Sequence, residues 1–340
     1  MPVIDKIHNG KNKKGEKNMK KFVAFVLVAM MLMVPFTGAY AAEETPVWAT
    51  ILQTNTNWNM SLSTNAQLVC DEYGWEQITL NSEADIQKQI DLIQSCISQR
   101  VLGFFVHSLD DHALTEYVEK AIDAGIYVFF GSTGILEYID QKYVDSGMLY
   151  AYNYDHIVAA ELAAEAVAES IGGKGKVAVL AGTAGALNTE LRATGFVDYI
   201  EANYPDIEIV TTINCDWDQM KAMSATEDIL SANPDLNAVY AMGEDMIVGA
   251  YEAVSGMGSE AKIVGIDASK KIMQMVIDGD VYAVVNCKPS GSESGCILTQ
   301  LLLDGQPIDN VEGIKVDGIV YGDIPVCFTQ ENASLDAADY

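Results

Sequence analysis

Short apolar runs alternate along the chain with longer stretches in which apolar residues recur every three or four positions. The runs 47–53 and 101–106 predict strands, and the second is almost wholly apolar, as expected for a strand buried on both faces. Isoleucines at steps of 4, 3 and 4 between positions 86 and 97 predict a helix with one buried face. This alternation indicates an α/β fold in which helical crossovers join parallel strands.

The alternation of strands and helices starts twice. In the first part we expect strands at 47–53, 76–81, 101–106 and 126–130, a helix at 58–73 ended by Gly74, a second helix opened by Asn81 or Ser82, and a third ended by Gly125. In the second part we expect strands at 176–181, 207–213, 238–242, 262–266 and 282–285, helices at 155–171, 189–204, 220–232, 245–255, 270–278 and 292–303, and an extended segment at 319–329. Two such sets predict two doubly wound lobes, because 340 residues exceed the span of one ordinary core. Ligands of such sheets bind beyond the carboxyl ends of the strands.

The first 41 residues have the pattern of an export signal behind an extension. Met19-Lys20-Lys21 precedes an apolar run of about 15 residues, and Ala39-Tyr40-Ala41 fits the small-x-small rule for cleavage. The run is short for a membrane span, which needs about 20 residues. We therefore predict a signal peptide at 19–41, and residues 1–18 as a non-native or misassigned extension ahead of a true start at Met19. No Cys follows the apolar run, so the lipid-anchored form of export lacks its acceptor.

Charge narrows the range of partners. The formal net charge is -28, and residues 1–41 hold seven of the 20 Lys and Arg residues but only two of the 48 acids. Residues 42–340 therefore carry a larger net negative charge than the whole chain. Such a surface repels nucleic acid and anionic lipid headgroups. We expect no nucleic-acid partner.

The six cysteines all follow the predicted signal peptide, and no C-x-x-C pair is present. Zinc-ribbon and thioredoxin-like sites are thereby excluded. Export permits disulfides, and Cys70 and Cys96 stand late in neighbouring predicted helices, which makes them the first candidates for a pair. The alternative is that the cysteines are buried free thiols.

Signatures of common catalytic sites are absent. The chain contains no G-x-x-x-x-G-K-[ST], no G-x-S-x-G and no H-E-x-x-H. Only His107, His112 and His156 follow Met19, and they share no metal-ligand spacing. We therefore expect no catalytic residue, no metal and no cofactor, and interpret the chain as a binding protein rather than an enzyme.

The order of segments resembles the type I periplasmic binding proteins of the ribose- and galactose-binding kind. The resemblance covers about residues 47–332. Its best-matching stretches are QLVCDEYGW (67–75), GFFVHSLDDHAL (103–114), VEKAIDAGIYVFF (118–130), GKGKVAVLAG (173–182), RATGF (192–196), NPDLNAVYAMGED (233–245), VGID (264–267) and residues 278–289. The lactose-repressor family shares this fold, but its DNA-binding headpiece is missing here.

The resemblance implies two doubly wound parallel-sheet lobes joined by a hinge of three crossovers. These crossovers would fall near 150–153, 286–289 and 314–321. The N-terminal lobe would comprise 45–151 plus 288–314, and the C-terminal lobe 152–287 plus 315–335. Ligand binding would close the lobes by hinge motion.

The same resemblance implies binding positions. The loop after the first strand holds Asn and an aromatic ring in the family, and here it supplies Asn55, Thr56, Asn57 and Trp58. An aromatic ring suits the apolar C–H face of a sugar; alternatively, Trp58 is a helix-start residue packed on its own lobe. Asp267 matches a carboxylate that accepts sugar hydroxyls, a role compatible with capping the next helix.

Several positions depart from the family pattern. His107 replaces Asn after the third strand, and Ser132 replaces an acidic residue ahead of a missing arginine. Glu190 stands where the second lobe usually has arginine, since Arg192 matches a structural arginine instead. Glu244 follows Gly243, which replaces Asn. Asn286 or Cys287 occupies the hinge position of Gln or Asn. Without the two arginines, a sugar, an amino sugar or a nucleoside-like ring stacked on Trp58 all stay open as ligands.

The leading functional hypothesis is an exported solute-binding receptor of an ABC importer, located in the periplasm or cell envelope. It would be a monomer whose partners are a small polar ligand and a membrane permease. One alternative is a sensory protein that presents its ligand to a chemoreceptor or sensor kinase. A secreted hydrolase is a further alternative, which would need a nucleophile–base pair or a metal cluster in the cleft.

Overall fold

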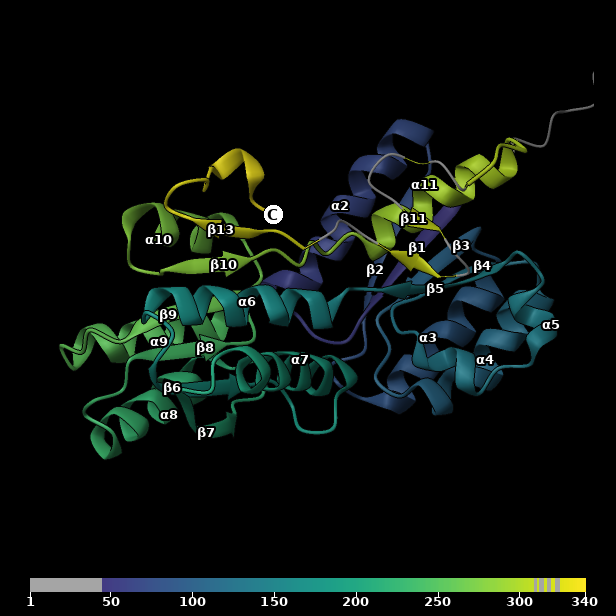
Figure 1. The fold of residues 1–340 in the computed structure, drawn as a ribbon. Helices are drawn as coiled ribbons and strands as arrows, with labels where there is room; N and C mark the ends of the chain where they lie inside the picture. The colour runs from purple at the N-terminus through teal and green to yellow at the C-terminus, as the bar shows by residue number, and fades with distance from the viewer. Residues whose placement is uncertain (1–44, 309–310, 312–314, 317–318, 322–324) are drawn as a thin grey trace, which may run out of the picture. The chain divides into compact units, whose positions relative to one another are not determined.

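Two sheets organise the computed structural model, which describes residues 45–308, 311, 315–316, 319–321 and 325–340 (Figure 1). The predicted signal peptide and extension lie outside these residues. Residues 46–340 form one compact unit. The first sheet has the order β11-β12-β5-β4-β3-β1-β2, and the second β13-β10-β9-β8-β6-β7. All described pairings are parallel except β11 with β12 and β10 with β13. The predicted α/β class with two parallel-sheet lobes is therefore confirmed.

The elements have the following bounds. The first sheet contains β1 (Val47–Leu52), β2 (Glu76–Asn81), β3 (Gly103–Val106), β4 (Tyr127–Phe130), β5 (Leu149–Asn153), β11 (Lys315–Val316) and β12 (Val320–Tyr321). The second contains β6 (Gly175–Ala181), β7 (Ile207–Asn214), β8 (Ala238–Ala241), β9 (Lys262–Ile266), β10 (Ala283–Val285) and β13 (Cys327–Thr329). The helices are α2 (Asn57–Tyr73), α3 (Ile86–Gln99), α4 (Asp111–Asp123), α5 (Gln141–Val144), α6 (His156–Ser170), α7 (Leu187–Asn203), α8 (Gln219–Ala232), α9 (Glu244–Gly256), α10 (Lys270–Asp278) and α11 (Gly291–Leu303), with 3-10 turns η1 (Gly134–Glu137) and η2 (Leu335–Ala337).

Local signals explain where most helices start and stop. The side chain of Thr56 accepts a hydrogen bond from the third residue of α2, and Gly74 ends that helix with φ +70°. Helix α3 begins later than the predicted start at Asn81 or Ser82. Glu83 and Ala84 have φ of +54° and +58°, a left-handed conformation that cannot form part of a right-handed helix, so the helix starts only after Asp85, which caps it.

Helices cover both faces of each sheet (Figure 1). In the first lobe α2 and α11 pack on one face, and α3 and α4 on the other. In the second lobe α6 packs over β8, β9 and β10 and against α7, whereas α8, α9 and α10 lie on the opposite face. The buried side chains of α6 are small, because most of them are alanines. Its buried alanines are Ala159, Ala160, Ala163, Ala164, Ala166 and Ala168.

The candidate pair Cys70–Cys96 is wrong, and the structure agrees with the alternative of free thiols. Strand order β3-β1-β2 sends the crossover through α2 one way and the crossover through α3 back, so right-handed connections place the two helices on opposite faces. Cys70 and Cys96 consequently lie in separate core clusters. Cys70 instead has its Sγ 3.6 Å from the Sγ of Cys296 on α11, and all six cysteines are free thiols.

Three connections join the two sheets, two of them close to their expected places. The chain leaves the first sheet after β5, through Tyr154 and Asp155, and returns through residues 286–290. The hydroxyls of Tyr152, near the end of β5, and Ser290 are 2.6 Å apart and link the end of that strand to the returning connection. The third was expected at 314–321. β12 ends at Tyr321 in the first sheet and β13 begins at Cys327 in the second, and residues 322–324 between them lie outside the described residues. Residues 315–321 were expected in the second lobe, but β12 pairs with β5 in the first sheet, which corrects that boundary.

Candidate functional site

Side chains from both sheets converge at the connection after β10. Trp58 follows β1 and His107 follows β3, while Asp267 and Cys287 follow β9 and β10. All stand at carboxyl ends of parallel strands, where ligands of such sheets bind. Trp58 contacts Cys287 from the first lobe, and Arg192 contacts it from the second. Cys287 is therefore the point at which the two halves of the site meet.

Trp58 spans from its own lobe to this connection. Its indole Nε1 donates a 2.8 Å hydrogen bond to the carbonyl oxygen of Cys287. Its ring centroid lies 5.3 Å from that of His107 and 5.2 Å from that of Tyr154. The indole is half-buried and packed on two other rings, which leaves an aromatic surface at the strand ends. A helix-start residue serving only its own lobe would not make the contact to Cys287.

The hydrogen bonds of His107 fix which of its nitrogens carries the proton. Its Nδ1 lies 2.8 Å from Oδ1 of Asn59. The amide nitrogen of Asn59 donates to the hydroxyls of Thr54 and Thr56. Oδ1 is thus the acceptor, and His107 donates from Nδ1, which leaves Nε2 as an acceptor. Burial lowers the pKa of His107 to about 4, so the ring is neutral near pH 7.

We expect this histidine to make the protein acid-sensitive. Between the ordinary pKa of 6.5 and the folded value of about 4, the unfolded chain binds a proton that the folded chain does not. The free energy of unfolding therefore falls as the pH drops through this window. Ligand affinity should fall as well near its lower end, because a protonated Nε2 no longer accepts.

Urea unfolding between pH 7.5 and 4.5 measures this dependence. His107→Gln keeps a donor toward Asn59 without titrating, and should flatten the slope. Burial, Arg192 and His107 also lower the pKa of His156, so this second histidine adds to the slope and part of the slope should remain in His107→Gln. An unchanged slope in His107→Gln would contradict the assignment.

A buried ion pair forms the second half of the site. The guanidinium of Arg192 donates to Oδ1 of Asp267 at 3.3 Å and to Sγ of Cys287 at 3.2 Å. It also donates to the carbonyl of Met242 and, through Nε, to Nδ1 of His156 at 3.3 Å. Burial, the largest single effect, lowers the pKa of Arg192, but Asp267 together with Cys287 and Tyr240 more than offsets it, so the pKa of the arginine is raised. Burial raises the pKa of Asp267, and Arg192 offsets part of that shift.

Trp217 adds a second aromatic ring that the sequence analysis missed. A Cβ at Gly182 would lie 2.0 Å from its ring, and one at Gly243 would lie 3.1 Å away, so both glycines leave room for the indole. The Arg192 guanidinium lies 5.8 Å from the ring centroid. The D-W-D triplet at 216–218, one residue after the end of β7, was the available signal, in a strand-end loop that the sequence analysis did not single out.

The arrangement of two lobes with these strand-end groups agrees with the family comparison. Residues 48–305 match the model of the periplasmic binding protein domain. The chain belongs to the periplasmic binding protein family. The ribose import binding protein of Bacillus subtilis is 25% identical over 286 residues, covering 80% of this chain and 89% of that protein. The D-allose-binding periplasmic protein of Escherichia coli is 26% identical over 316 residues, covering 88% and 97%.

Solved structures support the same fold. A periplasmic solute binding protein of an ABC transporter from Actinobacillus succinogenes, with bound D-allose, superimposes with a TM-score of 0.72 at 24% identity. It covers 85% of this chain and 99% of its own. A solute binding protein from Bacillus halodurans with bound myo-inositol gives a TM-score of 0.72 at 20% identity, covering 87% and 98%.

Some expected binding residues of this periplasmic binding protein have local roles or face solvent. Asn55 is exposed and accepts from the amide of Asn81, Asn57 is exposed, and Thr56 caps α2. The Ser132 hydroxyl donates to Asp111 at 2.5 Å, and Oδ1 of Asn286 accepts from the backbone of Val326 at 2.5 Å. Glu190 is exposed on α7, whereas Arg192 is 3% exposed. Trp58, His107, Glu244 and Asp267 are the predicted positions that come together with buried or half-buried side chains.

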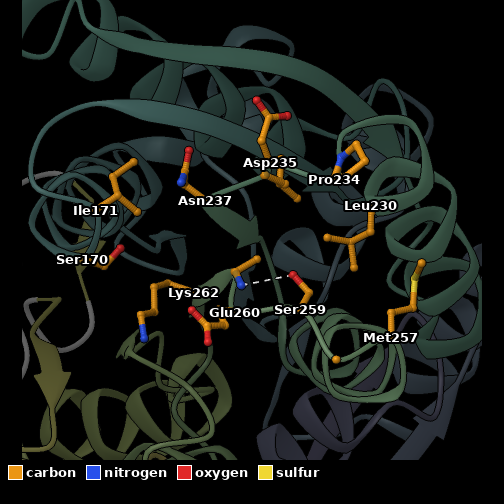
Figure 2. Close-up of a pocket in the computed structure, with 13 residues that line it drawn as sticks. Ser170, Ile171, Leu230, Pro234, Asp235, Asn237, Met257, Ser259, Glu260 and Lys262 are labelled. Atoms are coloured by element: carbon orange, nitrogen blue, oxygen red, sulfur yellow. Dashed lines mark hydrogen bonds between the residues drawn. The ribbon is translucent and has the colours of Figure 1, made fainter.

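A separate surface hollow lies at the other end of the second sheet (Figure 2). Its lining comes from the ends of α6, α8 and α9 and from the segments that enter β8 and β9, including Asn237 and Lys262. Asp267 follows β9 and therefore lies beyond the opposite strand end. Within the described residues no group of three His, Cys, Asp or Glu is arranged to hold a metal ion. In the same part of the chain, no helix combines the length and apolar character needed to cross a membrane.

Proposed function

We propose that this chain is the extracytoplasmic solute-binding receptor of an ABC importer, and that it binds a sugar or sugar derivative between its two lobes. The observation that carries this proposal is the meeting of Trp58 and the Arg192–Asp267 pair at Cys287 in a connection between the lobes. Family membership and relatives named for sugar import support it. Those relatives are binding proteins, which supports a receptor over an enzyme.

The chemistry of these groups suits a small polyol. Trp58 and Trp217 offer apolar ring faces for C–H groups. Asp267 and Nε2 of His107 are acceptors for hydroxyls, and a charged acceptor makes the stronger bond. The exposed Glu190 and the pairing of Asp267 with Arg192 leave fewer free carboxylates than the sequence indicated. We therefore place a neutral sugar ahead of an amino sugar or a nucleoside-like ring.

In the proposed working cycle the two lobes close on the ligand by motion at the hinge. We assign 45–153, 286–308, β11 and β12 to the first lobe and 154–285 with 325–340 to the second, so that closure would bring the ring of Trp58 toward Asp267. The signal peptide at 19–41 would deliver the protein to the periplasm or cell envelope, as a monomer that docks on its permease.

A ligand screen with one matched pair of variants tests the function. We expect at least one polyol among the sugars ribose, allose, apiose and arabinose and the cyclitol inositol to raise the melting temperature of residues 42–340. At 100 times its dissociation constant a ligand contributes about 2.7 kcal/mol to the free energy of unfolding. Trp58→Ala should weaken binding at least tenfold, whereas Leu68→Ala, at a position 64% exposed on the same helix, should not change it. The receptor proposal would be contradicted if the folded protein were stabilised by no sugar, amino sugar, nucleoside or amino acid.

A further inference from the structure

The segment after β13, residues 330–340, folds back onto the strand ends of the second sheet. It is drawn in yellow beside β13 and α10 (Figure 1). Asn332 closes a turn with Thr329, and the Ser334 side chain accepts from the backbone N–H of Asp336 to start η2. Beyond η2 the backbone of Asp339 donates to the carbonyl of Ala268 at 2.8 Å. We call residues 330–340 the distal segment. Nothing in the family resemblance assigned it a role.

Asp339 fastens the distal segment next to the central carboxylate of the site. Its side chain is 8% exposed, and Oδ2 accepts from the backbone N–H of Cys287 at 2.9 Å and of Ala268 at 3.1 Å. Ala268 follows Asp267, whose φ of +81° is unfavourable for a residue with a side chain. One carboxylate thus holds both the strained loop that presents Asp267 and the connection that carries Cys287.

Tyr340 reaches across the same strand end to the next helix. Its hydroxyl donates a 2.6 Å hydrogen bond to Oε2 of Glu244, the first residue of α9, and its carbonyl accepts from the backbone of Lys270. Glu244 is 7% exposed and close enough to Asp267 to raise the pKa of that carboxyl. Burial and the carboxylates of Asp267 and Glu244 raise the pKa of Tyr340, so its hydroxyl stays a donor.

These contacts determine which charges face a ligand. Asp267 is paired with Arg192, and Glu244 is bound by the Tyr340 hydroxyl. A carboxylate that already accepts a short hydrogen bond attracts a cation less than an unbound one. Without that hydroxyl, two neighbouring carboxylates would share the single arginine of the cluster.

We propose that Tyr340, anchored by Asp339, is a specificity-determining residue that makes the site prefer neutral polyols over cationic ligands. The proposal rests on the proposed sugar-binding function. It assigns selectivity to the distal segment as well as to the strand-end loops. Asp339 acts through Asp267 and Cys287 and is a positioning residue.

The test compares a neutral sugar with an amino sugar. Titration calorimetry at pH 7 on residues 42–340 would use ribose, allose and glucose as neutral probes and glucosamine and galactosamine as cationic ones. Tyr340→Phe should raise the ratio of amino-sugar affinity to neutral-sugar affinity at least tenfold, and added salt should reduce this gain. Tyr138→Phe, at a position 50% exposed, is the matched control. Tyr340→Phe combined with Glu244→Gln should restore the wild-type ratio, because the unbound carboxylate is then gone.

The outcomes separate the two proposals. Equal weakening of both ligand classes in Tyr340→Phe, or an unchanged ratio, would overturn the selectivity role while leaving the receptor function intact. A wild-type protein that binds no member of either class would overturn both. Asp339→Ala should lower all affinities and also shift the ratio in the direction of Tyr340→Phe, because it removes the anchor of the residue next to it, and Asp339→Glu should recover part of both. Unchanged affinities and an unchanged ratio in Asp339→Ala would contradict its assignment as a positioning residue.

Discussion

Replacing Asp267 with alanine is expected to lower the free energy of unfolding by about 3–5 kcal/mol and to abolish ligand binding. The side chains of Arg192 and Asp267 are 4% and 9% exposed, and their charged groups are 3.3 Å apart. Removing the carboxylate leaves a buried guanidinium without its counter-ion. Alanine also tolerates the φ of +81° at this position less well than aspartate.

Urea unfolding and calorimetry measure the two effects together. Asp235→Ala is the matched control, because Asp235 pairs with Lys176 at 2.8 Å but is 67% exposed, so its loss should cost about 1 kcal/mol at most. Asp267→Asn keeps a hydrogen-bond acceptor, so its loss in free energy of unfolding should lie between those of Asp267→Ala and Asp235→Ala. An Asp267→Ala protein as stable as the Asp235→Ala protein would show that the ion pair does not stabilise the lobe.

Oxidation is expected to join Cys70 to Cys296 and to stabilise the protein. Their Sγ atoms are 3.6 Å apart, both residues are fully buried, and 226 positions separate them in the sequence. In the loop-entropy description, a crosslink over more than 100 residues stabilises by about 5 kcal/mol. For a chain of this size that corresponds to a rise in melting temperature on the order of 10 °C.

Oxidation of this pair should be slow, so the experiment needs a long incubation. Burial and the hydrogen bond with Cys70 raise the pKa of Cys296, so little thiolate forms. Mass spectrometry of peptides after long incubation with oxidised glutathione would identify the link, and melting with and without reductant would give its effect. Cys70→Ser should remove the redox dependence, whereas Cys96→Ser should keep it. Four or fewer free thiols with a link other than 70–296, or six free thiols throughout, would contradict the expectation.

The sequence predicts elements well where the deciding signals are local. Helix α10 has its predicted bounds of 270–278, because Ser269 caps its start and Gly279 ends it with φ +85°. The partner of Cys70 is not predictable in this way. It depends on strand order, which places α2 beside α11 and away from α3. The distal segment lacks a periodic pattern altogether, and its hydrogen bonds to residues 268 and 287 are long-range.

The site was predictable as far as the rule of strand ends applies. Asp267, His107 and Trp58 follow strands, but the family resemblance is what singled them out among the residues beyond the strand ends. Glu190 and Arg192 stand two positions apart on α7, so they point to nearly opposite sides of the helix. The buried positions of α7 include Thr189, Arg192, Phe196 and Ile200, at steps of three and four. Reading that periodicity would have selected Arg192 over Glu190.

The alanine face of α6 has a consequence for how this protein can change over evolutionary time. A Cβ at Gly195 on α7 would lie 3.1 Å from the Cβ of Ala160, so neighbouring helix and sheet both leave α6 little space. A larger side chain on this face would push the helix off its sheet, whereas the loops at the strand ends can exchange residues without moving it. Larger side chains are therefore expected to be tolerated at the rim of the lobe and not at its middle. In agreement with this, solved structures 24% and 20% identical to this chain share its fold while one holds D-allose and the other myo-inositol.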